Sequence, residues 1–241
     1  SRWSCSDGCR RDGRRGLQLM RCPLASGRKA SMDAKRSTLQ FRVTLAEVEP
    51  LVWRRIEVPM NYSFWDLHVA LQDAMGWLDY HLHLFRVRNP KSGGTDEIGI
   101  PDEDAFEDAP VCLPGWEVPI AQYFVAAGTR GTYEYDFGDG WVHEIELEAV
   151  GQRQPGTKYP RCLDGLSTCP PEDCGGAHGY ARLLETIADP TDEEYESTME
   201  WLGGSFNPNA FSPRQVRFDN PKKRWRIAFA GEGDDRSSTA G

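Results

Sequence analysis

The sequence lacks any long run of apolar residues. No stretch of its 241 residues approaches the roughly 20 consecutive apolar side chains that a membrane-spanning helix needs. Residues 1–31 also lack the apolar segment of a secretory signal, because their longest hydrophobic run, LQLM, is too short. We therefore expect a cytoplasmic protein that has no membrane partner.

Internal repeats and low-complexity tracts are absent as well. A chain with 39% hydrophobic and 11% aromatic residues can fill a packed core. The first clear strand pattern follows shortly after Met32. We expect residues 1–31 to be a disordered arginine-rich leader or an extension of the gene model, residues 32–230 to be a single domain, and residues 231–241 to be a disordered tail.

Positive charge is scarce outside the leader. Residues 1–31 contain eight basic and two acidic side chains, and the whole chain carries −9, so residues 32–241 carry −15. A body this acidic repels phosphate backbones, which disfavours nucleic acid as a partner. We expect a protein partner instead. The leader and the basic KKRWR stretch near the C-terminus keep DNA association as an alternative.

The cysteines do not form the even set that a disulfide framework requires. Three of the seven, Cys5, Cys9 and Cys22, lie in the leader. Without an export signal the compartment is expected to be reducing, so the cysteines of the body are read as free thiols or metal ligands.

The hydrophobic patterns predict strands in hairpins and helices toward the C-terminus. Ser63 with Asp66 forms a capping-box pattern at the start of a helix that Gly76 ends. The expected elements are a hairpin of strands 39–48 and 51–59, a helix over 63–76, strands 81–87 and 96–100, a short helix over 118–128, a hairpin over 131–150, and helices 179–190 and 191–204. This order predicts an α+β fold with a mixed, mainly antiparallel sheet and helices packed against it.

A polar stretch, YPRCLDGLSTCPPEDCGGAHGY at residues 159–180, has cysteines at spacings that suit a metal. Zinc binds about four thiolate or imidazole ligands in a tetrahedron. The candidate zinc ligands are Cys162, Cys169, Cys174, His178 and, from the 131–150 hairpin, His143. The alternative is that the thiols pack the loop against the sheet without a metal.

A second group of residues is acidic and rich in imidazole. General acid–base hydrolysis or a hard metal ion would require such side chains. The candidates are Asp136, Asp139, His143, Glu172, Asp173, His81 and His83. We expect His81 and His83 to share one face of a strand. The alternatives are turn and cap carboxylates, and a hydrogen-bonded core position for His143.

Several stretches together resemble a known family. They are LVWRRIEVP, DLHVALQDAMGWLDYHLHLF, YEYDFGDGWVHEIELE, the 159–180 stretch and EWLGGSFNPNAF, in this order from about Leu39 to Phe211. They are similar to the Ri-plasmid open-reading-frame-three-like family, some members of which are labelled as a resolvase-like passenger of an insertion sequence. The resemblance implies a compact cytoplasmic α+β domain without an established activity. We do not expect recombination activity, because residues 32–241 show no nucleophilic serine among arginines that could clamp a phosphate.

Three functions follow as hypotheses. The first is a non-catalytic binding or regulatory module that holds a structural zinc and engages a protein partner. The second is a metal-dependent hydrolase or nuclease that uses the acidic and imidazole group. The third is a DNA-associated protein of a mobile element. The first two depend on the 159–180 loop packing against the 131–150 hairpin, so that ligating atoms from both meet.

Overall fold

The computed structural model describes residues 33–102 and 110–229. All of them belong to one compact unit, residues 32–241. The expected leader, its three cysteines and the expected tail lie outside the described residues. Within the described ranges, each helix is too short or too polar to cross a lipid bilayer.

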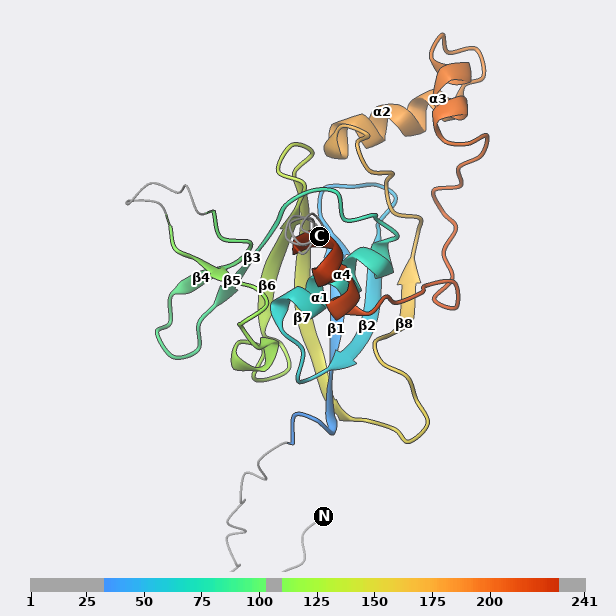
Figure 1. The fold of residues 1–241 in the computed structure, drawn as a ribbon. Helices are drawn as coiled ribbons and strands as arrows, with labels where there is room; N and C mark the ends of the chain where they lie inside the picture. Colours follow the sequence, from blue (N-terminus) through green and yellow to red (C-terminus); the bar gives the residue numbers. More distant parts are fainter. Residues whose placement is uncertain (1–32, 103–109, 230–241) are drawn as a thin grey trace, which may run out of the picture. The chain divides into compact units, whose positions relative to one another are not determined.

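Eight strands and four α-helices confirm the predicted α+β class (Figure 1). In chain order they are β1 (Ser37–Leu45), β2 (Trp53–Pro59), α1 (Phe64–Met75), β3 (His83–Arg88), β4 (Thr95–Gly99), β5 (Cys112–Pro114), the 3-10 helix η1 (Ile120–Gln122), β6 (Arg130–Tyr135), β7 (Trp141–Gln152), β8 (Arg161–Leu166), α2 (Gly176–Ala188), α3 (Tyr195–Trp201) and α4 (Pro221–Phe229). The strands form one sheet in the order β5-β4-β3-β6-β7-β1-β2-β8. Only the β4–β5 pair in this described sheet is parallel.

Helix α1 begins and ends where its sequence predicts. The Ser63 side chain accepts a hydrogen bond from the Asp66 backbone, and the Asp66 carboxylate accepts one from the Ser63 backbone. Gly76 then adopts a left-handed conformation with φ of 88°, which a side chain would disfavour. These two caps satisfy backbone groups that a bare helix end would leave unpaired.

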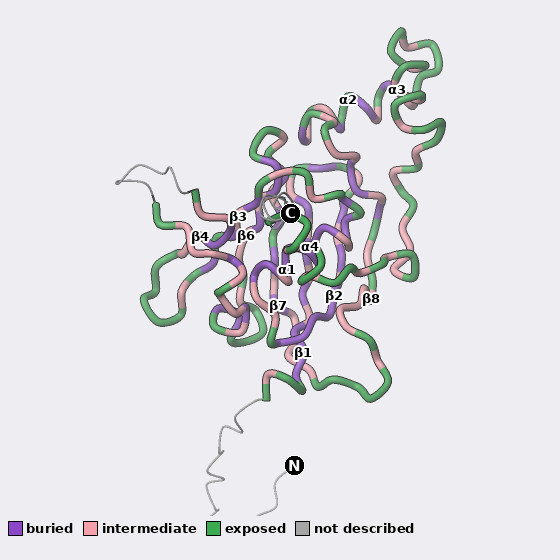
Figure 2. The backbone as a smooth tube through the Cα atoms, viewed as in Figure 1, coloured by how far each residue is buried: buried purple, intermediate pink, exposed green. Residues whose placement is uncertain are grey.

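The core lies between α1 and one face of the sheet. Phe41, Phe64, Phe85 and Tyr133 are each completely buried. Their rings meet edge-on or tilted, with Phe64 and Phe85 centroids 5.1 Å apart and Phe85 and Tyr133 centroids 4.7 Å apart. Figure 2 shows buried and less buried positions alternating along β1, which gives the sheet an apolar face and a polar face.

Several elements differ from the sequence expectations, and the short strand β5 is one that was not expected. Strand β8 occupies part of the stretch predicted as a loop, because it pairs with β2 although RCLDGL shows no apolar alternation. The 118–128 region contains only the 3-10 turn η1. Helix α4 was not predicted, and it is held by aromatic contacts of Trp225 rather than by an apolar pattern of its own.

Candidate functional site

Three segments that are far apart in the sequence meet beside the β6–β7 turn. They are residues 77–82 after α1, the turn 136–140, and residues 167–175 of the cysteine-containing stretch. The Trp77 indole donates to the Pro170 carbonyl at 2.8 Å, and the Gly175 amide donates to Asp139 Oδ2 at 3.1 Å. The 159–180 stretch therefore does pack against the hairpin.

At this meeting point His81, Asp136 and Asp173 bring their ligating atoms together. His81 Nε2 lies 3.0 Å from Asp173 Oδ1 and 3.5 Å from Asp136 Oδ2. One ligating atom from each of the three lies within 4.8 Å of the others, and no second group of three His, Cys, Asp or Glu residues does so in the described part of the chain. We call these three residues the HDD cluster.

Local backbone geometry aims the two carboxylates of the HDD cluster. Asp136 and Asp173 both adopt left-handed conformations, with φ of 57° and 60°. Asp136 Oδ1 accepts hydrogen bonds from the amides of Gly138 and Asp139, at 3.0 and 3.3 Å. Aspartate tolerates this conformation because its side chain can close such a turn. Asp136 Oδ2 is left to face His81.

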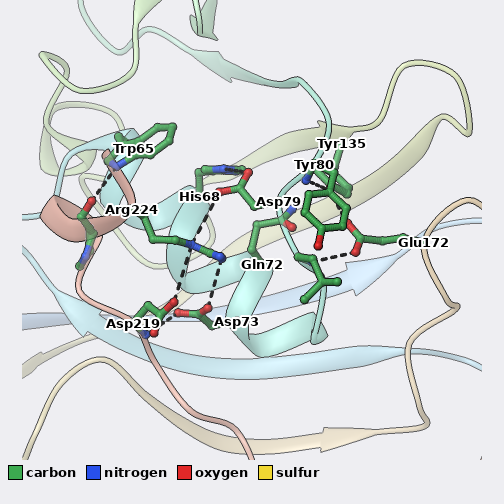
Figure 3. A network of polar contacts seen from close by, with 12 residues as sticks. Trp65, His68, Gln72, Asp73, Asp79, Tyr80, Tyr135, Glu172, Asp219 and Arg224 are labelled. Carbon is green, nitrogen blue, oxygen red and sulfur yellow. Dashed lines mark hydrogen bonds and ion pairs between the residues drawn. The ribbon is translucent and has the colours of Figure 1, made fainter. Parts of the chain in front are cut away.

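Glu172 and Tyr135 form a neighbouring hydrogen-bonded pair that ties the same segments together. The Tyr135 hydroxyl donates to Glu172 Oε1 at 2.5 Å and accepts from the Tyr80 amide at 3.0 Å. Glu172 Oε2 accepts from the Leu78 amide at 2.8 Å. Figure 3 shows Tyr80, Tyr135 and Glu172 close together. Burial and the adjacent carboxylate raise the pKa of Tyr135, so the phenol stays protonated and remains a donor.

The expectation that His81 and His83 share an environment is wrong. Strand β3 begins only at His83, so His81 lies in the preceding loop and is partly exposed. His83 is buried and its ring stacks on His68 at 3.6 Å. Burial lowers the pKa of His83 well below its ordinary value. Of the two, only His81 is available to a ligand.

His143 is a core histidine. It is completely buried on β7, its Nδ1 lies 3.2 Å from the Tyr133 carbonyl oxygen, and its ring meets Trp77 edge-on. Burial lowers its pKa to about 4, so it is neutral near pH 7. It does not join the carboxylates, although it was a candidate for both sites.

The proposed thiol ligands do not form a close group of three in the described part of the chain. Cys162 lies on β8, which pairs it with Ile56, Cys169 is buried, and His178 is exposed on α2. The described cysteines, including Cys112, are free thiols. Burial raises the pKa of Cys162 and of Cys169, and that of Cys174 to about 12, so these thiols stay protonated. No three of Cys162, Cys169, Cys174, His143 and His178 place their ligating atoms within 4.8 Å of one another.

The sequence analysis missed a polar network that joins α1 to α4, and Figure 3 draws it. His68, completely buried on α1, bonds to the Tyr133 hydroxyl and to Asp79 Oδ1, both at 2.8 Å. Arg224 on α4 lies 3.8 Å from Asp79 Oδ2 and 3.4 Å from Asp73 Oδ1. Burial raises the pKa of Asp73 to about 6, and Arg224 partly offsets this. The first of the two arginines in KKRWR is thus engaged with the protein itself.

Arg54 is a second missed residue, and it is almost completely buried. Its guanidinium donates to the carbonyls of Ala74, Trp53 and Leu166, at 2.9, 2.8 and 2.8 Å. Ala74 lies in the last turn of α1, where carbonyls lack helical partners. Arg54 alternates with Ile56 and Val58 along β2. This alternation was the signal in the sequence that could have placed Arg54 on the buried face of the strand.

Comparison with known proteins places this fold among relatives without assigned activities. The family model described as plasmid pRiA4b ORF-3-like protein matches residues 37–215. The uncharacterized protein y4hQ of Sinorhizobium fredii (strain NBRC 101917 / NGR234) is 37% identical over 193 residues, 78% of this chain and 94% of that protein. The crystal structure of MM3350, a protein of unknown function from Methanosarcina mazei Go1, has a TM-score of 0.68 and 39% identity, covering 76% of this chain and 99% of that one.

Proposed function

Because the chain belongs to the plasmid pRiA4b ORF-3-like family, and y4hQ and MM3350 carry no activity to transfer, we propose a function from the site itself. The chain is a non-catalytic, protein-binding module whose contact surface is organised by a divalent metal ion. His81, Asp136 and Asp173 hold the ion. The convergence of these three side chains from separate segments is the observation that carries the proposal.

The donor set supports a transition metal over calcium or magnesium. One imidazole nitrogen with two carboxylate oxygens suits zinc or manganese, whereas calcium and magnesium prefer oxygen donors throughout. Three protein ligands leave a coordination position open, which a donor from a partner can fill. A cation here would also offset the repulsion between the Asp136 and Asp173 carboxylates.

The surroundings of the HDD cluster support binding to a protein. Leu78, Tyr80, Leu82 and Phe137 are 57%, 71%, 55% and 52% exposed, and they flank the cluster residues in sequence. Large apolar side chains beside a polar centre are typical of protein contact surfaces. The HDD cluster residues do not line any of four cavities of about 440, 530, 420 and 510 Å³ on the described surface. The protonated thiols offer no activated nucleophile.

Metal titration of the full chain tests the proposal. Protein treated with chelator is titrated with Zn²⁺, Mn²⁺ or Mg²⁺ by calorimetry, and its thermal unfolding is followed in parallel. We expect one Zn²⁺ or Mn²⁺ per chain and, at a free concentration 100 times the Kd, stabilisation by about 2.7 kcal/mol. Asp173→Asn removes an exposed ligand and should weaken binding at least tenfold.

Two matched variants decide where the ion binds. Asp164→Asn changes an exposed carboxylate on β8, away from the HDD cluster, and should leave the Kd unchanged. Cys174→Ser should also leave it unchanged. Loss of binding in Cys174→Ser with retention in Asp173→Asn would place the metal at the thiols and overturn the assignment.

The open coordination position favours a second candidate, a metal-dependent hydrolase, because catalytic zinc sites keep one position for water. A panel of phosphoester substrates distinguishes the two functions. Metal-dependent turnover that disappears in Asp136→Asn would establish the enzyme and refute the non-catalytic module. Asp139→Asn serves as a comparison, because Asp139 bonds to the Gly175 amide rather than to His81.

A further inference from the structure

The polar face of the sheet contains an arginine-rich groove that no part of the proposed function uses. It is a cavity of about 440 Å³ across β1, β7, β6, β3 and β4, and it includes none of the HDD cluster residues. Arg42, Arg86, Arg88 and Arg130 line it together with Glu144 and Glu146. Four guanidinium groups in one hollow are unexpected on a body that carries −15.

Strand register arranges the groove in cross-strand rows. Arg42 pairs with Glu146, and Glu146 pairs with Arg130. Gly131 pairs with Val87, so the same register sets Arg130 beside Arg88. One row therefore reads Arg42, Glu146, Arg130, Arg88 across four strands.

Two of these arginines are neutralised within the fold. Arg130 Nη2 lies 2.8 Å from Glu146 Oε2. Arg86 lies 2.8 Å from Glu97 and 2.6 Å from Glu134. The pair of Glu146 and Arg130 in the middle of the row is thus close to neutral, and Arg86 is neutralised in the adjacent row.

The arginines at the two ends of the row make no ion pair with any described carboxylate. The Arg42 guanidinium stacks over the Trp53 ring at 4.1 Å, which leaves its N–H edge free. Arg88 donates to the Gly93 carbonyl at 3.3 Å. Glu148 interacts electrostatically with Arg42 but lies beyond ion-pair distance. Each end of the groove therefore offers a positioned guanidinium without a directly paired carboxylate, and this group recognises a carboxylate through two parallel hydrogen bonds.

The separation of the two ends selects an elongated ligand. Neighbouring strands lie about 4.8 Å apart, so three strand spacings between β1 and β3 correspond to roughly 14 Å. In an extended peptide, at about 3.3 Å per residue, side chains four positions apart lie on one face and roughly 13 Å from each other. A single phosphate ion is too small to bridge this distance.

The acids of the groove select against a polyanion. Glu144 pairs with Thr44 and Thr132 in the adjacent row and makes no ion pair with the described residues. A nucleic acid would bring a continuous line of phosphates against Glu144 and against the acidic body. A peptide has spaced carboxylates and has amide donors between them, which Glu144 and the threonine hydroxyls can accommodate.

We propose that this groove binds an extended acidic segment of a partner protein, with Asp or Glu side chains at positions i and i+4 on Arg42 and Arg88. The proposal goes beyond the metal-organised surface and does not depend on it. It identifies a second contact face, with a sequence preference that can be tested in chelator.

Fluorescence anisotropy of the full chain with labelled peptides tests the proposal. The probe is an extended threonine–valine peptide with Glu at i and i+4, and its control carries Gln at both positions. We expect saturable binding of the Glu peptide and at least tenfold weaker binding of the Gln peptide. Arg42→Gln and Arg88→Gln should each weaken binding of the Glu peptide at least tenfold. Binding of the Glu peptide to the wild-type chain should be stronger at low salt.

Arg182→Gln is the matched control, because Arg182 lies on α2, outside the groove, and is paired with Asp192 and Glu194. It should leave the affinity unchanged. Arg88→Gln keeps the test valid if Arg42→Gln unfolds through loss of its stacking on Trp53. Equal affinity of the Glu and Gln peptides, or tighter binding of a single-stranded RNA oligomer that the same variants abolish, would overturn the assignment.

Discussion

Adjacent residues can have opposite roles when they lie on a strand, as Arg54 and Arg55 do. Arg54→Ala leaves three carbonyls near the end of α1 without their donor, so we expect the free energy of unfolding to fall by about 3 kcal/mol or more. Arg55→Ala removes a partly exposed ion pair with Glu148, and we expect a loss of about 1 kcal/mol or less. Urea unfolding of the two variants measures both losses in the free energy of unfolding. Equal losses would contradict a buried structural role for Arg54 and a surface role for Arg55.

Buried histidines make stability fall in acid. The unfolded imidazole titrates near pH 6.5, whereas burial lowers the pKa of His143 to about 4. Between these values only the unfolded chain binds the proton, so the free energy of unfolding decreases as the pH falls, by up to about 3 kcal/mol. His83 acts in the same direction. Asp73 opposes them, because its pKa of about 6 makes the folded state bind a proton first as the pH falls.

His143→Gln isolates this effect from the titration of Asp73. We expect urea unfolding of the variant to lose less stability than the wild type between about pH 7 and about pH 4.5, by roughly 2 kcal/mol. The Asp73 contribution is common to both proteins and cancels in the difference. Parallel pH profiles would show that His143 does not titrate in this way.

Helix α4 is attached to the rest of the fold through the side chain of Trp225. Trp225 meets Trp65, Trp116 and Phe229, with ring centroids 5.7, 4.7 and 4.0 Å apart. Trp225→Ala should lower the free energy of local detachment by about 2 kcal/mol, and so speed subtilisin cleavage of this helix roughly 30-fold. Arg226→Gln, on the exposed side of the same helix, should leave the cleavage rate unchanged. Equal rates in both variants would mean that aromatic packing does not hold the helix.

Local signals explain which elements the sequence predicts. Helix α1 and the β6–β7 hairpin follow from a capping box, a terminal glycine and apolar alternation, all within short stretches of sequence. Strand β8 and helix α4 have weak local patterns and form through β2 and through Trp65 and Trp116. Long-range packing of this kind leaves no periodic mark in the segment itself.

For the whole molecule, we propose that residues 32–230 fold as one domain without residues 1–31. A chain that starts at Met32 should unfold in a single transition, with coincident midpoints by circular dichroism and fluorescence, within about 1 °C of the full chain. A salt titration of DNA binding by the two forms measures any role of residues 1–31 in nucleic-acid contact. Separate transitions, or a lower midpoint in the shorter chain, would refute a single independent domain.

The candidate site was harder to predict from the sequence than the fold. His81, Asp136 and Asp173 are chemically conspicuous, but their meeting depends on β3 pairing with β6 and on residues 167–175 docking beside Asp139. His143 belongs to the buried alternation with Trp141 and Ile145, which favours its core position. The thiol spacing alone did not predict the geometry, because no three of the proposed zinc ligands place their ligating atoms within 4.8 Å of one another.

The two edge strands of the sheet, β5 and β8, are where another copy of the chain could add a strand. At one margin β5 is only three residues long and ends in Pro114, which has no amide hydrogen to offer. At the other, the Thr168 hydroxyl donates to the carbonyls of Asn207 and Ala210, and the Phe211 ring lies against Gly165. One margin is therefore very short, and residues 207–211 cover the C-terminal end of the other, which reduces the open ladder available for strand addition by another copy. Deleting residues 205–215 should uncover the C-terminal end of β8 and raise the tendency of the chain to self-associate, which light scattering of the two proteins at equal concentration measures.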